Sequence, residues 1–198
     1  MKALEDKRQI REEVEKNLRE KDPEEIKHEN ERICRIILEN IREDVRIVCA
    51  YVALETEADL TTVIDVLKKR GVKVFLPCSN DSGNGMTFRE FDNWEELKSG
   101  KFGTKEPKED SPTLKQGEAD IVLIPGRAFD INGDRVGRGG GSYDTWIESE
   151  RSLDESNSEY WGVALTDQVV EYIPVEDHDQ KMDAVITPDE IVVTKKDA

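Results

Sequence analysis

A strand, a helix and a second strand in direct succession constrain the fold of this chain most. Residues 46–52 (Arg-Ile-Val-Cys-Ala-Tyr-Val) predict a buried strand, and residues 72–76 predict the next one. Between them, residues 59–70 carry apolar side chains at helical spacing, and Gly71 ends the helix. This succession predicts a right-handed crossover within a parallel sheet. Ligands of such sheets bind beyond the carboxyl ends of the strands, so we expect functional residues in the loops that follow those ends.

The rest of the pattern predicts more strands and helices around the same sheet. One helix is expected over residues 1–20, and another begins at Asp22, an N-cap residue followed by Pro23 at the first helical position. Further strands are expected at residues 86–91, 121–124, 161–165, 184–187 and 191–194, and a further helix at 145–152. We therefore expect an α/β protein, a three-layer α/β/α fold with a mainly parallel, Rossmann-like central sheet and the N-terminal helices packed on it. No repeat or linker divides the chain, so residues 1–198 are expected to form a single domain.

Charge limits the partners of the chain. Lysine and arginine number 29 against 45 aspartates and glutamates, which gives a net charge of −16. This charge opposes general nucleic-acid binding, which needs a basic face. No apolar run reaches the length of a membrane span, no signal peptide opens the sequence, and the three cysteines lack the CxxC spacing of metal or redox sites. We expect a cytoplasmic monomer with reduced thiols, whose partners are small molecules and neither nucleic acid nor membrane.

The segment of residues 125–144 is the richest in functional chemistry. Its glycines and arginines are Gly126, Gly133, Gly137, Gly139, Gly140 and Gly141, and Arg127, Arg135 and Arg138. Glycines let backbone N–H groups approach a ligand without interference from Cβ, and guanidinium groups suit phosphate oxygens. Asp144 closes the segment, where its carboxylate could hold Mg²⁺ against phosphate.

Other interpretations of this segment are weaker or excluded. A glycine-rich stretch after a strand can be only a flexible turn, but the arginines and the closing Asp144 favour an anion site. The segment is not a Walker A loop, because no Gly-Lys-Ser/Thr follows it. Gly137 and Gly139 fit the dinucleotide-binding fingerprint, but Ser142 stands where its third glycine belongs.

Residues 126–130 (Gly-x-x-Phe-Asp) and 133–144 (Gly-x-Arg-Val-Gly-x-Gly-x-Gly-x-Tyr-Asp) resemble the signature of the 5-formyltetrahydrofolate cyclo-ligase (methenyltetrahydrofolate synthetase) family. The resemblance implies that Asp144 binds Mg²⁺ and that Tyr143 and Arg135 act in catalysis. The ATP-binding residues that it implies in this segment are Arg135, Gly137, Arg138, Gly139, Gly140, Gly141 and Tyr143. The family usually has Tyr-Tyr-Asp here, so Ser142 would remove an aromatic wall whose stacking is worth about 1 kcal/mol.

Two further motifs supply charged groups. Lys7 and Arg11 lie four residues apart on one helix face, and alone they would indicate a solvated basic pair. They match the Lys-x-x-x-Arg with which the family opens, and the resemblance implies that both reach ATP phosphate. Residues 171–190 are strongly acidic and alone indicate a surface loop. Within them, residues 174–183 resemble the family's Pro-x-Glu-x-His-Asp-x-x-x-Asp, in which Asp179 would be a second Mg²⁺ ligand.

Substrate-binding residues are implied by three other positions. Glu57 follows the strand at 46–52, where a carboxylate can serve only to favour the next helix N-terminus. Residues 57–61 resemble the family's Glu-x-Asp-Thr segment, whose Glu contacts the pterin, and a carboxylate can accept two N–H bonds from that ring. Val52 occupies a position that lines the same pocket in the family, and residues 102–107 (Phe-Gly-Thr-Lys-Glu-Pro) resemble an element near the folate site. The implied substrate-binding residues are Val52, Glu57, Glu106 and Tyr143.

The resemblance runs from Lys7 to about Thr187 in matching order. It implies an ATP- and Mg²⁺-dependent ligase that converts 5-formyltetrahydrofolate to 5,10-methenyltetrahydrofolate, with phosphorylation of the formyl oxygen and release of ADP and phosphate. One alternative is a non-catalytic relative that binds nucleotide or folate, although a pure binder needs no metal pair. Another is a different enzyme on a similar fold, such as a sugar-phosphate isomerase or a CoA transferase, which would bind its ligand without Mg²⁺.

Overall fold

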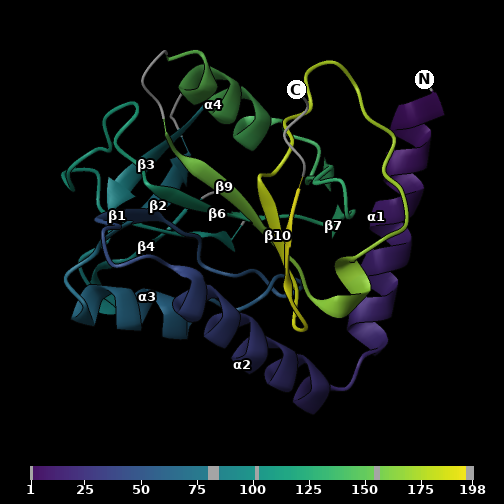
Figure 1. The fold of residues 1–198 in the computed structure, drawn as a ribbon, viewed down its shortest axis with the longest axis horizontal. Coiled ribbons are helices and arrows are strands. Elements are labelled where there is room, and N and C mark those ends of the chain that lie inside the picture. The colour runs from purple at the N-terminus through teal and green to yellow at the C-terminus, as the bar shows by residue number, and fades with distance from the viewer. Residues whose placement is uncertain (1, 80–84, 101–102, 154–156, 195–198) are drawn as a thin grey trace.

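The computed structural model describes residues 2–79, 85–100, 103–153 and 157–194. Its centre is a seven-stranded sheet in the order β11-β10-β9-β6-β1-β2-β3 (Figure 1). The strands are β1 (Ile47–Cys49), β2 (Lys73–Ser79), β3 (Met86–Glu90), β6 (Ile121–Pro125), β9 (Glu159–Val163), β10 (Ala184–Ile186) and β11 (Ile191–Val193). The five inner strands pair in parallel, and β3 and β11 run antiparallel at the two edges.

Helices cover both faces of this sheet. They are α1 (Lys2–Glu20), α2 (Pro23–Asn40), α3 (Thr61–Lys69) and α4 (Ser142–Arg151). In Figure 1, α2 and α3 lie below the sheet and α4 lies above it. Two separate apolar cores match this arrangement: one joins α1, α2 and α3 to one face, and the other joins α4 to the opposite face. The expected three-layer α/β/α fold with a mainly parallel sheet is therefore confirmed.

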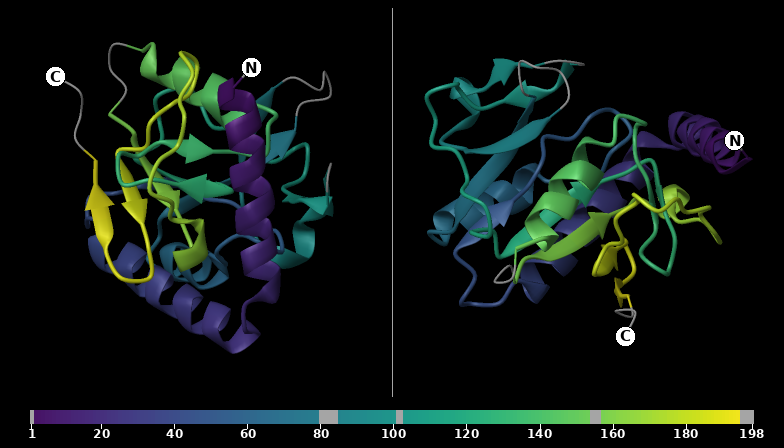
Figure 2. Two further views of the ribbon diagram at one scale, coloured as in Figure 1. Left: turned by 90° about the vertical axis from the view of Figure 1, so that its right-hand side faces the viewer. Right: turned by 90° about the horizontal axis from the view of Figure 1, so that it is seen from above.

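Short elements frame the ends of the strands. They are η1 (Trp94–Glu96), β4 (Lys98–Ser99), β5 (Lys105–Glu106), β7 (Ala128–Phe129), β8 (Arg135–Val136) and η3 (Thr166–Gln168). β7 and β8 form an antiparallel ribbon within the glycine-rich segment. α1 contacts this ribbon and η3 (Figure 2). Among the described residues, none of the helices has the length and apolar character needed to cross a membrane.

Local sequence signals explain several boundaries. The Asp22 side chain accepts a hydrogen bond from the Glu24 N–H at 2.9 Å, and Pro23 begins α2, as the sequence predicts. Gly71 takes a positive φ of 80° just after α3. β2 and β3 pair antiparallel, and the residues between them, 80–84, lie outside the described residues.

Several predicted boundaries are wrong. The strand expected to end at residue 76 continues as β2 to Ser79. The strand expected at 46–52 pairs only over Ile47–Cys49, because the chain then leaves the sheet toward the cavity described below. The strand expected at 161–165 begins at Glu159, in register with Ile121 of β6. The helix expected from Thr145 begins at Ser142, because the preceding Gly141 adopts a left-handed conformation with φ 64°.

The connections reverse direction next to β1. From β1 the chain passes through α3 on one face to β2, whereas from β6 it passes through α4 on the opposite face to β9. A crevice opens at such a reversal beyond the carboxyl ends of the two strands. The segments that follow β1 and β6 should therefore line a site.

Candidate active site

A cavity of about 780 Å³ occupies this reversal point. Its walls come from the chain after β1, the end of β2, the glycine-rich segment after β6, the loop at 176–179 and α1. Every residue that the sequence predicted for the site lines it: Lys7, Arg11, Val52, Glu57, Glu106, Arg135, Gly137, Arg138, Gly139, Gly140, Gly141, Tyr143, Asp144 and Asp179. The volume suits a ligand of cofactor size.

The glycine-rich segment owes its shape to a buried aspartate. Asp130 Oδ1 accepts hydrogen bonds from the N–H groups of Asn132 and Asp134, which closes the turn between β7 and β8. Its Oδ2 accepts another from the N–H of Ile173 at 3.1 Å. Asp130 thereby binds the turn to the chain that follows η3. These hydrogen bonds fix the position of the β7–β8 ribbon.

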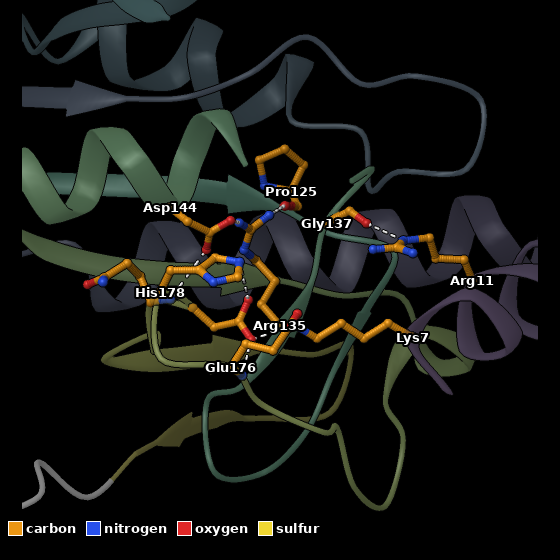
Figure 3. Close-up of polar contacts among 10 residues, drawn as sticks. Lys7, Arg11, Pro125, Arg135, Gly137, Asp144, Glu176 and His178 are labelled. Carbon is orange, nitrogen blue, oxygen red and sulfur yellow. Dashed lines mark hydrogen bonds and ion pairs between the residues drawn. The ribbon is translucent and has the colours of Figure 1, made fainter. Parts of the chain in front are cut away.

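The buried Arg135 and the half-buried Asp144 form an ion pair that lines the cavity. Arg135 Nη2 lies 2.9 Å from Asp144 Oδ2, and its Nη1 donates to the Pro125 carbonyl at 3.3 Å (Figure 3). A Cβ at Gly137 would lie only 2.9 Å from Nη1, so the glycine makes room for the guanidinium. Asp144 Oδ1 accepts a hydrogen bond from the Gln180 N–H at 3.3 Å, so this carboxylate joins α4 to the acidic loop.

α1 brings two cations into the cavity. Lys7 Nζ lies 2.5 Å from Asp179 Oδ2 and 3.1 Å from Glu176 Oε2, and Arg11 Nε donates to the Gly137 carbonyl at 2.7 Å (Figure 3). Burial disfavours the Lys7 charge, but hydrogen bonds and attraction from Asp179 and Glu176 outweigh it, so the pKa of Lys7 is raised. Lys7 thus binds the loop at 176–179 and Arg11 binds the glycine-rich segment, and both cations line the cavity between these two segments.

The carboxylates suit a hard divalent cation. Ligand atoms of Glu176, His178 and Asp179 lie within 4.8 Å of one another. Carboxylate oxygens are the donors that Mg²⁺ prefers, so the residues present fit this ion through Asp179 and Glu176. The sequence assigned only Asp179 here. The Glu-x-His-Asp spacing is present in the sequence, but it does not predict that Glu176 lines the cavity and pairs with Lys7.

Glu57 forms another part of the cavity wall. Its carboxylate is buried, accepts the Leu54 N–H at 3.0 Å through Oε2, and pairs through Oε1 with Arg138 at 3.2 Å. Val52 is half-buried in the same wall. Arg138 is exposed, so a ligand that donates its own N–H groups to Glu57 could take the place of this guanidinium.

Tyr143 offers an unused hydroxyl to the cavity. Its Oη is buried and has no hydrogen-bond partner within the described parts of the chain. The ring lies edge-on to Phe88 and 5.6 Å from the Arg135 guanidinium. Burial, and then the negative charge of Glu57, raise the pKa of Tyr143 well above its usual value, so the hydroxyl stays protonated and can donate.

Two other lining residues are Glu106 and Ser142. Glu106 is half-buried and accepts hydrogen bonds from the hydroxyls of Thr104 and Ser79 at 2.9 and 3.2 Å. Phe102, part of the same sequence motif, lies outside the described residues. Ser142 is exposed at the start of α4, where a larger side chain would border the cavity.

Sequence reasoning also left Arg127 without a specific role. Its guanidinium bonds to the Thr56 hydroxyl and lies 3.9 Å from Glu15 of α1. Burial and the neighbouring charge of Arg138 lower its pKa. Arg127 thus links α1 to the loop after β1 rather than standing free among the glycines.

Known proteins resemble this chain over most of its length. The sequence model of the 5-formyltetrahydrofolate cyclo-ligase family matches residues 3–188. A 5-formyltetrahydrofolate cyclo-ligase of Mycolicibacterium smegmatis is 30% identical over 172 residues, covering 84% of this chain and 86% of its own. A probable 5-formyltetrahydrofolate cyclo-ligase of Schizosaccharomyces pombe is 32% identical over 155 residues, covering 73% and 76%.

Solved structures share the fold. The 5,10-methenyltetrahydrofolate synthetase of Aquifex aeolicus superposes with a TM-score of 0.80 at 24% identity and covers 97% of this chain and 94% of its own. The corresponding synthetase of Mycoplasma pneumoniae gives 0.73 at 17% identity, with 92% and 99% covered. The expected family and the expected ligase class are confirmed: the chain belongs to the 5-formyltetrahydrofolate cyclo-ligase family.

Proposed function

We propose that the protein converts 5-formyltetrahydrofolate to 5,10-methenyltetrahydrofolate in the cytoplasm as a monomer, using ATP with Mg²⁺ and releasing ADP and phosphate. The proposal rests above all on one observation: cations, carboxylates and a buried tyrosine hydroxyl that has no partner among the described residues line one cavity, although they come from five distant chain segments. The relatives carry the same activity in their names.

The phosphate end of the cavity would be formed by α1 and the glycine-rich segment. Lys7, Arg11 and Arg135 would neutralise phosphate charge, and the backbone at 137–141 would approach the phosphates closely. Asp144 and Asp179 would hold Mg²⁺, with Glu176 beside them. When bound, this ion would neutralise the negative charge of the phosphates and fix their orientation.

The folate end would be formed by Val52, Glu57, Glu106 and Tyr143. Glu57 would accept N–H bonds from the pterin ring after Arg138 turns away toward the nucleotide. The Tyr143 hydroxyl would donate a hydrogen bond to the substrate near the formyl group. Its raised pKa keeps it protonated, and only the protonated hydroxyl can donate. Ser142 leaves this end more open than a tyrosine would.

The reaction needs alignment more than a covalent nucleophile. The formyl oxygen attacks the γ-phosphorus, ADP departs, and the formyl carbon becomes a phosphorylated imidate. N10 of the folate then attacks that carbon, its proton is lost, and phosphate leaves with the former formyl oxygen. The side chains hold the two substrates in line and neutralise charge as it moves between the phosphates.

The test is near-ultraviolet absorbance, because the methenyl product absorbs where its 5-formyl precursor does not. The protein is mixed with 5-formyltetrahydrofolate, ATP and Mg²⁺, and each component is omitted in turn. We expect absorbance to rise only in the complete mixture. Asp144→Ala is expected to abolish turnover, because it removes a proposed metal ligand and leaves Arg135 without its partner.

Asp110→Ala is the control, since Asp110 is exposed in a loop outside the cavity. It should retain wild-type turnover. Full activity of Asp144→Ala would overturn the metal assignment, whereas a flat trace from folded wild-type protein that still binds ATP would overturn the proposed reaction.

A further inference from the structure

Gln168 is completely buried. It does not line the cavity itself, but its side chain bonds to Gly126, which does. Its Nε2 donates hydrogen bonds to the carbonyls of Gly126 at 2.7 Å and Thr56 at 3.2 Å. Its Oε1 accepts a third from the Leu165 N–H at 2.9 Å. Both N–H donors and the carbonyl of the amide are therefore in use.

The two carbonyls belong to the two segments that follow β1 and β6. Gly126 directly follows β6, and Thr56 precedes Glu57 in the loop after β1. The Gln168 amide bonds to both segments beyond the ends of these two paired strands. Arg127 joins the same two segments a second time, because its guanidinium donates to the Thr56 hydroxyl.

The short helix that carries Gln168 is itself held firmly. Lys21, at the corner between α1 and α2, lies 2.5 Å from Asp167 and 2.6 Å from Glu29. Glu29 also accepts the Thr166 N–H at 3.2 Å. Lys21 and Glu29 are each less than a tenth exposed, so this network fixes η3 against the helices.

We propose that Gln168 is a positioning residue for the folate end of the cavity. Its amide fixes the separation of the loops after β1 and β6, and so sets where Glu57 stands relative to the glycine-rich segment. Only a carboxamide of this length can donate to two carbonyls and accept an N–H at once. The inference rests on the proposed function, because the ligand that meets Glu57 is the reduced folate.

The test compares two isosteric Gln→Glu variants. Gln168→Glu keeps the shape but, when ionised, has no donor and faces two carbonyl oxygens. We expect the KM for 5-formyltetrahydrofolate to rise about tenfold or more at pH 8. The KM for ATP should change by less than about threefold, because Lys7 and Arg11 come from α1 and Arg11 holds the proposed phosphate-binding backbone at Gly137 independently of Gln168. Gln116→Glu is the matched control, since that side chain is exposed and bonds to Ser149 at the surface.

The pH dependence of the KM for folate distinguishes a positioning role of Gln168 from a nonspecific loss of structure in the variant. A buried carboxyl group has a raised pKa, and its protonated form regains one donor. The KM defect of Gln168→Glu should therefore shrink as pH falls from 8 to 6, relative to wild type at each pH. Gln168→Met, an apolar side chain of similar length, should raise the same KM with no such pH dependence.

The outcomes are distinct. A folded Gln168→Glu or Gln168→Met protein with the wild-type KM for folate would overturn the inference and leave the proposed function intact. Loss of folded protein in both variants, judged by circular dichroism, would also overturn it, because Gln168 would then serve stability alone. Wild-type protein that neither binds 5-formyltetrahydrofolate in equilibrium dialysis nor turns it over would overturn the proposed function and the inference with it.

Discussion

At the scale of single residues, the Tyr143 hydroxyl stands out because it is buried without a partner in the described part of the chain. An unsatisfied buried polar group costs about 1–3 kcal/mol. Tyr143→Phe removes that cost, so we expect its free energy of unfolding to equal or exceed that of wild type. The same change should lower kcat/KM for 5-formyltetrahydrofolate about tenfold, since a hydrogen bond to the substrate is lost. Thermal melting and steady-state kinetics measure the two effects.

Tyr172→Phe is the matched control for this prediction. Tyr172 is 66% exposed and does not line the cavity. It should change neither stability nor kinetics. A Tyr143→Phe protein that melts earlier but turns over normally would contradict the role given to the hydroxyl and would make it structural.

At the scale of elements, α4 contributes Glu150 to the interior beside the second core. This carboxylate is 1% exposed and accepts the Gly117 N–H at 2.8 Å. Burial raises its pKa above the usual value, an effect that the hydrogen bond only partly opposes. An acid whose pKa is raised on folding adds stability at low pH that is lost as pH rises through the folded pKa.

Glu150→Gln should therefore stabilise the protein at pH 7, because glutamine keeps an acceptor for Gly117 and never ionises. The difference from wild type should vanish below about pH 4, where glutamate is protonated in both states. Urea unfolding at several pH values tests this, with Glu148→Gln on the exposed face of the same helix as control. A stabilisation that stays constant down to pH 3 would refute the explanation.

The elements themselves were largely predictable from sequence because their signals are local. Asp22 and Pro23 mark the start of α2, and apolar spacing marks α3 and the strands. The start of α4 was missed because residues 142–144 belong to a glycine-rich motif, and nothing local shows that Gly141 would act as the N-cap. Asp144 consequently lies within the first turn of α4, where it meets both Arg135 and Gln180.

The sequence predicts which residues line the cavity, but it does not predict which of their charged side chains pair with each other. Motifs named residues from Lys7 to Asp179 that line one cavity. Each charge was assigned to a ligand, but buried charges need partners when no ligand is bound. The pairs Lys7–Asp179 and Arg138–Glu57 meet that need, and they join residues 172 and 81 positions apart. No local pattern encodes such contacts, and the Gln168 bridge between two loops was missed for the same reason.

At the scale of the whole molecule, the net charge of −16 opposes anionic ligands at long range. The cavity counters this field with cations held at close range, and several of them are already paired with carboxylates. An anionic ligand that enters the cavity must therefore compete with these carboxylates for the cations. The protein should respond to the right pair of ligands far more than to anions in general.

Ligand-induced stabilisation tests this expectation directly. A ligand present at 100 times its Kd stabilises the native state by about 2.7 kcal/mol, which corresponds to a Tm rise of roughly 5–10 °C for a chain of this size. We expect such a rise with ATP and Mg²⁺, and a separate one with 5-formyltetrahydrofolate. Lys7→Gln should reduce the first while sparing the second, because Lys7 pairs with the proposed metal-side residues Asp179 and Glu176, whereas Glu57 pairs with Arg138. Sugar phosphates and CoA at the same concentrations serve as controls; a rise with either, and none with the folate, would favour a different enzyme on this fold.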